Sequence, residues 1–391
     1  MDIRDWLRQT VEIDASDLHL MAGSPPIVRV WGDLIPLRQE VLRPEDTHAL
    51  AVSLLSAEQR ARFEERWDLD FSTGLAGSGR FRVNLYRQRG TVAIAIRVVP
   101  THIPTIEQLN LPPKLKDLCR LPRGLVLVTG ATGQGKSTTL AAMLDYINTH
   151  RTVNVITIED PIEYIHANKR SFFNQREVGE DTRSFATALR AGLREDPDVI
   201  MVGEMRDLET IATALTIAET GHLVFATLHT ATAGQSVDRI IDVFPPAQQQ
   251  QTRVQLAGVI EAVISQQLLP NRLYFHRLGG ERDAALLSPS RPRRASSAEG
   301  HWPGLEDAGR VPAVELLVAT PAIRNLIRES KTHQIHSAIQ TGGEYGMQTM
   351  DAALAGLVRR RLISLEDALG RAVYPEEVRR QAGPHPHGSA R

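Results

Sequence analysis

Gly130-Ala131-Thr132-Gly133-Gln134-Gly135-Lys136-Ser137 fits the pattern G-x-x-x-x-G-K-[ST], in a chain of 391 residues. Glycines in this pattern let the backbone curl until its N–H groups converge on phosphate oxygens. Lys136 reaches the β- and γ-phosphates, and the Ser137 hydroxyl is a ligand for Mg²⁺. The stretch therefore predicts a loop that binds the phosphates of ATP. We take residues 130–138, which end at Thr138, as the nucleotide-binding set.

The residues on either side of this loop have the pattern that such a loop requires. Leu125-Val126-Leu127-Val128 is a short apolar run, typical of a buried parallel strand. Leu140, Met143, Leu144 and Ile147 follow at helical spacing. The alternative is a glycine-rich turn that binds nothing. A strand, the loop and a helix in this order favour phosphate binding, because the helix N-terminus adds a favourable dipole.

Further strand and helix patterns alternate from residue 114 to 275, which we assign to a P-loop core. We expect strands at 153–158, 199–202 and 223–226, and a helix at 208–220. The last expected element is a helix whose apolar face holds Leu256, Val259, Ile260, Val263 and Ile264. The fold class is α/β, with a mostly parallel sheet.

The rest of the chain divides by composition. Residues 1–100 read as an α+β unit with a hairpin at 27–37, and a proline-rich linker spans 101–113. Residues 276–310 lack periodicity and are expected to be a disordered loop insertion. A strand and helices are expected over 311–375, followed by a disordered tail at 376–391.

Composition excludes several classes of protein. Hydrophobic residues make up 42% of the chain, which excludes disorder as its overall state. The 45 basic and 46 acidic residues balance, which disfavours a nucleic-acid binder or DNA translocase. Cys119 is the single cysteine, so an intrachain disulfide and a Cys-based zinc cluster are excluded. We expect no signal peptide and no membrane helix, because no apolar run approaches about 20 residues.

Acidic residues follow two of the expected strands. Asp160 and Glu163 come after the strand at 153–158, and Glu204 comes after the strand at 199–202. Carboxylates beyond the carboxyl ends of parallel strands face the ligand crevice. One of them can hold a metal ion and another can polarise the attacking water. The alternative is that they cap helices or lie on the surface.

Histidines and arginines supply further candidates. His222 and His229 flank the strand at 223–226, where a histidine can donate to phosphate or serve only structure. Arg82 and Arg97 lie in the N-terminal unit, and phosphoryl-transfer sites often import an arginine to neutralise developing charge. The alternative is an exposed strand arginine. Three similar candidates in the core are Arg190, Arg194 and Arg206.

These motifs together resemble one family, the secretion ATPases, and within it the type IV pilus retraction ATPases of the PilT family. The resemblance covers nearly the whole chain. Residues 15–26 resemble the family's N-terminal PAS-like domain, residues 156–163 its Asp box, residues 194–207 its Walker B region and residues 219–230 its His box. The resemblance implies that a RecA-like NTPase domain follows the PAS-like domain along the chain and that helices follow at the C-terminus.

The resemblance also implies roles for single residues. Glu163 would activate the attacking water, and Glu204 would be the Walker B acid near Mg²⁺, with Ser137 and Asp160 as further candidate ligands. His222 and His229 would link the nucleotide site to domain movement. Arg82 and Arg97 would approach the phosphates. The family forms hexamers, so a homohexamer is expected.

The finer assignment depends on residues 322–328 (AIRNLIR), which look like the C-terminal motif of the retraction motors. The alternative is a simple amphipathic helix. The expected function is ATP-driven pilus retraction and twitching motility, at the cytoplasmic face of the inner membrane. Expected partners are a membrane platform protein and other pilus motors, with no nucleic acid. A pilus-assembly, accessory or type II secretion ATPase is the alternative, and a regulatory module without hydrolysis is a more distant one.

Overall fold

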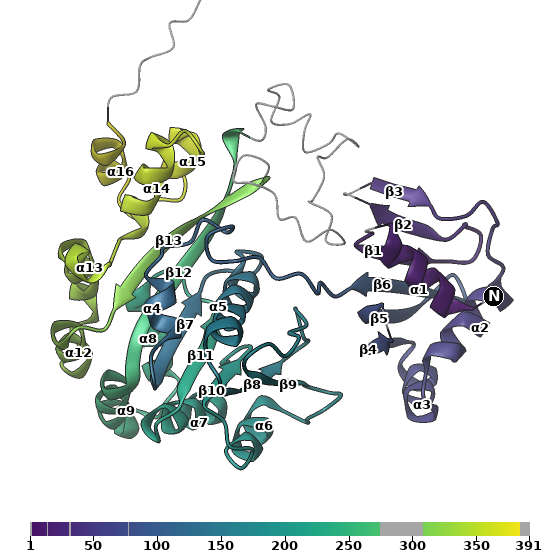
Figure 1. The fold of residues 1–391 in the computed structure, drawn as a ribbon, viewed down its shortest axis with the longest axis horizontal. Helices are drawn as coiled ribbons and strands as arrows, with labels where there is room; N and C mark the ends of the chain where they lie inside the picture. The colour runs from purple at the N-terminus through teal and green to yellow at the C-terminus, as the bar shows by residue number, and fades with distance from the viewer. Residues whose placement is uncertain (1, 14, 31–32, 77, 274–307, 384–391) are drawn as a thin grey trace, which may run out of the picture. The chain divides into compact units, whose positions relative to one another are not determined.

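The computed structural model describes residues 2–13, 15–30, 33–76, 78–273 and 308–383 (Figure 1). These residues form two compact units. The first holds residues 2–102 together with Glu163–Ile165. The second holds Ile103–Ile162, residues 166–273 and residues 308–383. In the described residues no helix is long and apolar enough to cross a bilayer.

The first unit is an antiparallel sheet with three helices. The strand order is β3-β2-β1-β6-β5-β4. The strands are β1 (Asp17–Leu20), β2 (Ile27–Val30), β3 (Asp33–Pro36), β4 (Asp68–Leu75), β5 (Gly79–Gln88) and β6 (Thr91–Val98). The helices are α1 (Ile3–Glu12), α2 (Pro44–Leu54) and α3 (Ala57–Arg66). Every second residue of β5 from Phe81 to Leu85 is buried, as the alternation predicts.

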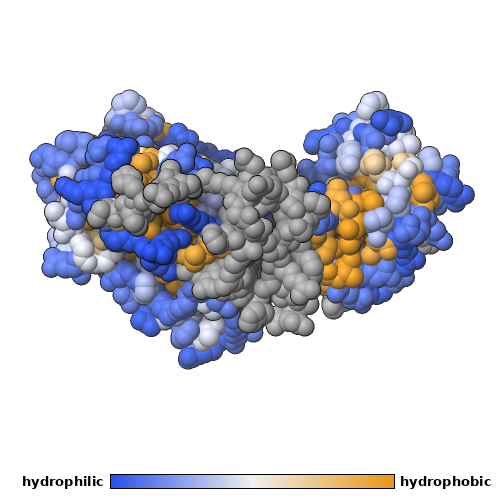
Figure 2. Space-filling view, turned by 90° about the horizontal axis from the view of Figure 1, so that it is seen from above, coloured by the Kyte–Doolittle hydropathy of each residue, from blue (hydrophilic) through white to orange (hydrophobic). Residues whose placement is uncertain are grey.

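The apolar residues of this unit do not all reach its core. Trp6, Leu18 and Phe81 are buried together in the core. Leu34 and Ile35 of the edge strand β3 are exposed by 54% and 42%. Figure 2 shows apolar surface on this unit, at the right of the view. An exposed apolar edge strand is a surface on which another chain can pack.

The second unit is built on a seven-stranded sheet in the order β13-β12-β7-β11-β10-β8-β9. The strands are β7 (Gly124–Thr129), β8 (Asn154–Glu159), β9 (Phe172–Glu177), β10 (Val199–Val202), β11 (Leu223–Leu228), β12 (Ile260–Pro270) and β13 (Arg310–Val318). All neighbouring pairs are parallel except β12 with β13. The predicted α/β class with a mostly parallel sheet is confirmed.

Helices cover both faces of this sheet. Leu125 and Leu127 of β7 point into one core, and Val126 and Val128 into the other, because side chains alternate along a strand. The helices are α4 (Leu115–Cys119), α5 (Lys136–His150), α6 (Phe185–Gly192), α7 (Leu208–Glu219), α8 (Ala233–Asp242), α9 (Pro246–Val259), α12 (Pro321–Arg328), α13 (Ile335–Thr341), α14 (Met350–Arg359), α15 (Leu365–Leu369) and α16 (Pro375–Ala382). The α4 and α5 residues belong to the second of these cores.

The prediction that one helix continues from Leu256 to Ile264 is wrong. Helix α9 ends at Val259, and strand β12 begins at the next residue. Residues 262–265 are completely buried between β7 and β13. A strand that is buried on both faces is apolar at consecutive positions, so its pattern also fits a buried helix.

The C-terminal region differs from expectation in a second way. Helix α16 occupies Pro375–Ala382, and all but its first residue lie in the stretch 376–391, for which a disordered tail is predicted. Pro375 stands at its first position, where the missing N–H costs nothing, and Val378 is fully buried. The rest of the predicted tail, 384–391, lies outside the described residues, as does all but 308–310 of the predicted loop at 276–310.

Candidate active site

The glycine-rich loop connects the end of β7 to the start of α5. Gly130, Gly133 and Gly135 have φ angles of 143°, 79° and 83°, which residues with a side chain rarely adopt. A Cβ atom on Gly135 would lie 2.8 Å from Nε2 of Gln266. The backbone conformation therefore requires glycine at all three positions, and close packing requires it at Gly130 and Gly135 as well.

Lys136 is the first residue of α5 and is buried. Its Nζ donates to the carbonyl oxygens of Gly130 at 2.7 Å and Ala131 at 3.1 Å. Burial lowers the pKa of Lys136, and the nearby negative charge of Glu204 opposes that shift. The ammonium group is thus held against the loop itself, while Ser137 is exposed at the helix N-terminus. Such a terminus attracts phosphate oxygens.

Two glutamines fasten the loop to β12. Gln266 is buried and donates from Nε2 to the carbonyl of Gln134 at 2.7 Å, while its Oε1 accepts from Thr139 at 2.7 Å. The Gln134 side chain accepts from the N–H of Leu268 at 2.5 Å. The motif predicts a loop that works through its backbone, and gives no sign of these contacts. The sequence pattern does not reveal Gln266, because its strand β12 begins at Ile260, within residues 256–264, where a helix is expected.

Glu204 lies two residues beyond β10, at the same edge of the sheet as the loop. Its Oε1 lies 2.5 Å from Nε of Arg206 and 3.1 Å from Nε2 of His229, which directly follows β11. Burial opposes ionisation of the carboxyl, but the hydrogen bonds and charges of Arg206 and His229 outweigh it. The pKa of Glu204 is therefore below its ordinary value, and the group is a carboxylate at neutral pH.

The end of β8 supplies the other acidic residues. Glu159 is buried, and its Oε1 accepts from Thr157 at 2.7 Å. Asp160 is the next residue and is exposed. Glu177, at the end of the neighbouring β9, accepts from the N–H of Ile162 at 3.0 Å. Glu177 fixes the backbone immediately before Glu163, a role that the sequence pattern did not reveal.

Glu163 belongs to the first unit, together with the two residues after it. Its Oε2 lies 2.9 Å from Nη2 of Arg82, and the N–H of Ile165 donates to the carbonyl of Pro100 at 3.3 Å. Two of the sequence-predicted candidates, Arg82 and Glu163, are therefore in direct contact. The chain passes into the second unit at His166.

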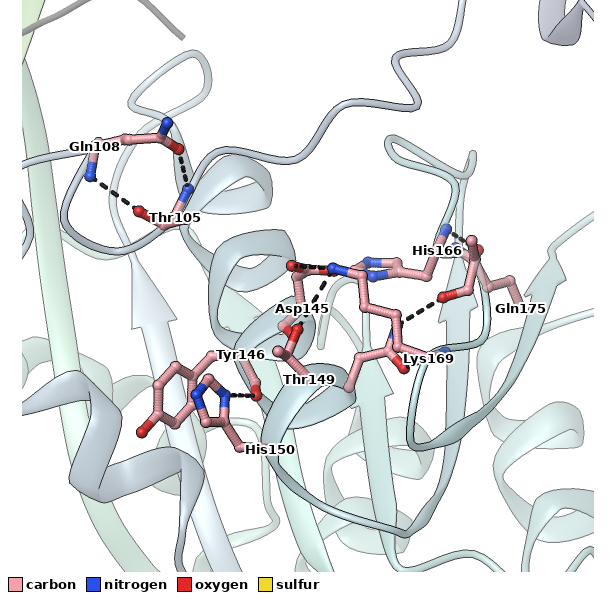
Figure 3. A network of polar contacts seen from close by, with 11 residues as sticks. Thr105, Gln108, Asp145, Tyr146, Thr149, His150, His166, Lys169 and Gln175 are labelled. Carbon is pink, nitrogen blue, oxygen red and sulfur yellow. Dashed lines mark hydrogen bonds and ion pairs between the residues drawn. The ribbon is translucent and has the colours of Figure 1, made fainter. Parts of the chain in front are cut away.

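The segment that follows Glu163 is attached to helix α5 (Figure 3). Lys169 Nζ lies 2.7 Å from Oδ1 of Asp145, and Asn148 exchanges hydrogen bonds with the backbone of Ala167 and Lys169. His166 stacks on Phe173 with 4.6 Å between ring centroids. Since α5 starts at the phosphate loop, one helix connects that loop to residues 166–169 of the second unit.

Other predicted residues are not brought to the loop. His222 precedes β11 and so lies at the opposite edge of the sheet from His229. Its Nδ1 contacts Thr220 Oγ1 and the carbonyl of Ile217, both at 3.1 Å. Residues before and after one strand lie at opposite edges, so only one of this pair can reach the site within a chain.

Three of the candidate arginines have acidic or backbone partners elsewhere. Arg97 lies 2.8 Å from Oδ1 of Asp17 within the first unit. Arg190 forms an ion pair with Glu209, and Arg194 donates to the carbonyl of Arg190 at 3.4 Å. Among the three candidate arginines of the core, Arg206 is the one that contacts a carboxylate of the candidate site, that of Glu204.

The family described as "Type II/IV secretion system protein" matches residues 41–369. The chain is 47% identical over 376 residues to the type IV pilus retraction ATPase PilT of Pseudomonas aeruginosa, covering 96% of this chain and 99% of that protein. It is 44% identical over 358 residues to a twitching motility protein of Neisseria gonorrhoeae, covering 92% and 87%. The crystal structure of the pilus retraction motor PilT with bound ADP matches with a TM-score of 0.82 and 48% identity, over 97% and 99% of the two chains.

Proposed function

This chain belongs to the type II/IV secretion system protein family, and on that premise we propose that it is an ATPase that powers type IV pilus retraction and twitching motility. The observation that carries the proposal is 47% identity to a retraction ATPase over nearly the full length of both chains. The glycine loop, Lys136 and Glu204 supply the chemical parts that hydrolysis needs.

ATP is the substrate, and residues 130–138 bind its phosphates. The N–H groups of the loop and of the first turn of α5 surround the phosphate oxygens. Lys136 exchanges its two carbonyl partners for phosphate oxygens when ATP binds, so its positive charge meets the negative charge of the substrate. The glycines already have these backbone angles before ATP binds, which lowers the cost of ordering the loop.

The residues present also fit Mg²⁺. Ser137 is exposed at the start of α5, and Glu204 is an ionised carboxylate at the same sheet edge. Oxygen donors of these two kinds are what Mg²⁺ prefers. We propose Ser137 and Glu204 as its protein partners, with Asp160 as a third. When bound, the ion neutralises charge on the phosphates.

Glu163 is the proposed general base. It accepts a proton from water as the water oxygen attacks the γ-phosphorus, and the bond between that phosphorus and the bridging oxygen breaks to release ADP. Its contact with Arg82 holds both groups in one place. Arg82 and Arg97 are proposed to offset charge that develops on the phosphate. His222 and His229 are proposed to link the nucleotide site to domain movement. His229 would do so through its contact with Glu204, and His222 at the other edge of the sheet.

We also propose the assembly and the location. The active form is a homohexamer, which works at the cytoplasmic face of the inner membrane against a platform protein and alongside other pilus motors. Rotation of the first unit against the second, driven by ATP binding and hydrolysis, is the proposed source of movement. The boundary lies at residues 102–103, just inside the proline-rich stretch that was expected to be the linker.

The direct test is the substitution Glu163→Gln, with phosphate release measured in the purified protein. We expect turnover to fall about 100-fold or more, because general base catalysis contributes roughly that much. ATP affinity should remain within about threefold of wild type, because the loop is untouched.

Glu64→Gln is the matched control. Glu64 is an exposed glutamate that lies 2.9 Å from Arg60, the same separation as in the Arg82–Glu163 pair, but it is on helix α3. Its turnover should equal that of wild type. Wild-type turnover in Glu163→Gln would show that Glu163 is not the base.

A further inference from the structure

Three helices in the C-terminal region bring together one imidazole and two carboxylates. His336 is on α13, Asp351 on α14 and Glu377 on α16. One ligand atom from each residue lies within 4.8 Å of the other two. None of the three belongs to the nucleotide-binding set.

The imidazole of His336 has a buried nitrogen that nothing satisfies. In the described part of the chain, its Nε2 is inaccessible to solvent and makes no hydrogen bond. The ring packs at 54° to that of Tyr374, with 4.8 Å between centroids. A buried polar nitrogen without a partner is costly, so a group that bonds to it here would be favoured.

The two carboxylates are held in position by neighbours. Asp351 is completely buried, and its two oxygens accept from the N–H groups of Val373 at 2.8 Å and Tyr374 at 2.9 Å. Glu377 accepts from Nε2 of Gln340 at 3.1 and 3.3 Å. Each carboxylate oxygen retains a further lone pair. Hydrogen bonds of this kind orient metal-binding carboxylates in proteins.

The local charge favours a cation. Glu315, buried on β13, is close enough for its charge to interact with those of His336 and Asp351. Burial raises the pKa of Asp351, and repulsion from Glu377 adds to this shift. Burial also raises the pKa of Glu315, and repulsion from Asp351 adds to it. The charge of His336 opposes both shifts. The carboxyl groups of Asp351 and Glu377 lie beside one imidazole, and a bound dication would offset their mutual repulsion.

We propose that His336, Asp351 and Glu377 form a site for a divalent transition metal, with Zn²⁺ as the ion that fits best. One imidazole nitrogen and two carboxylate oxygens are ligands that Zn²⁺ accepts, and Mg²⁺ is disfavoured because it avoids nitrogen. Three protein ligands leave a position for water. Because each ligand comes from a different helix, the ion fastens α16 to α13 and α14.

The test is Zn²⁺ binding by the full chain, measured by equilibrium dialysis against ZnCl₂. Wild type is expected to bind one more Zn²⁺ per chain than His336→Ala or Glu377→Gln. Taking the difference removes Zn²⁺ that binds elsewhere, including at the nucleotide site. Saturating Zn²⁺ should also raise the Tm of wild type by more than it raises the Tm of either variant.

Two matched controls lie close by. His333→Ala removes an exposed histidine three residues from His336, and Glu376→Gln changes an exposed glutamate next to Glu377. Both should bind as much Zn²⁺ as wild type. If His336→Ala does not fold, Glu377→Gln decides the matter, because Glu377 is only partly buried. Equal Zn²⁺ binding by wild type and Glu377→Gln would overturn the proposal.

Discussion

His166 is a buried residue whose titration links the active-site surroundings to pH. Burial lowers its pKa to about 4 from 6.5, with Lys169 adding to the shift and Asp145 opposing it. The buried Nδ1 makes no hydrogen bond in the described chain, and the ring stacks on Phe173. The ring lies in the segment attached to α5 (Figure 3).

This shift predicts a loss of stability in acid. Between pH 6.5 and pH 4 the unfolded state binds a proton at His166 that the folded state does not, so unfolding becomes easier as the pH falls. The full effect is on the order of 3 kcal/mol, at about 1.4 kcal/mol per pKa unit. His166→Phe should reduce the pH dependence of the free energy of unfolding in this window, as measured by urea denaturation.

His150→Phe is the control for this prediction. His150 is exposed and stacks on Tyr146 at 4.0 Å between centroids, in the same network. Its replacement should leave the pH dependence as in wild type. Identical curves for His166→Phe and wild type would show that His166 does not titrate differently in the folded state.

At the scale of single residues, the sequence predicted the groups whose role is local. Lys136 and Ser137 follow from the motif, because the loop's chemistry is contained in eight consecutive residues. Gln266 and Glu177 could not be predicted, because each acts through side-chain hydrogen bonds on a segment more than ten residues away. His222 could not be distinguished from His229 without knowing which end of β11 faces the loop.

Strand β12 is the element on which the geometry of the loop depends. It pairs with β7 on one side and β13 on the other, and carries Gln266 to the loop. Gln266→Ala removes two hydrogen bonds that hold Gln134 and Thr139, each worth about 1 kcal/mol. ATP affinity should fall about tenfold, since binding must then order the loop. Isothermal titration with ATP would measure this.

Gln267→Ala is the control on the same strand. Gln267 is the next residue, so its side chain points to the other face of the sheet. Its ATP affinity should match that of wild type. Equal affinities for Gln266→Ala and wild type would show that β12 does not position the loop.

The junction between α9 and β12 explains a limit of sequence-based prediction. Residues 256–264 are mostly apolar. Gly258 is the single residue among them that could mark the change from helix to strand. Arg324 on α12 fastens this junction, donating to the carbonyls of Ala257 and Gly258 and pairing with Glu261. Arg324 lies in the 322–328 motif, so part of that motif has a structural role that only the fold reveals.

At the scale of the whole molecule, the proposed active form is a homohexamer. The apolar edge of the first unit, with Leu34 and Ile35 exposed, would be expected to be covered in an assembly. Native mass spectrometry of the purified protein with ATP should give a species of six times the chain mass. A monomer at micromolar concentration in the presence of nucleotide would contradict the assembly.

The proposed function is that ATP hydrolysis by this chain retracts pili. The most direct measurement is surface pilin and twitching motility in a strain that lacks the gene, complemented with wild type or with Glu163→Gln. We predict abundant surface pili without motility in the deletion strain and in the Glu163→Gln strain, and restored motility with wild type. Cells without pili after deletion would contradict retraction and indicate an assembly motor.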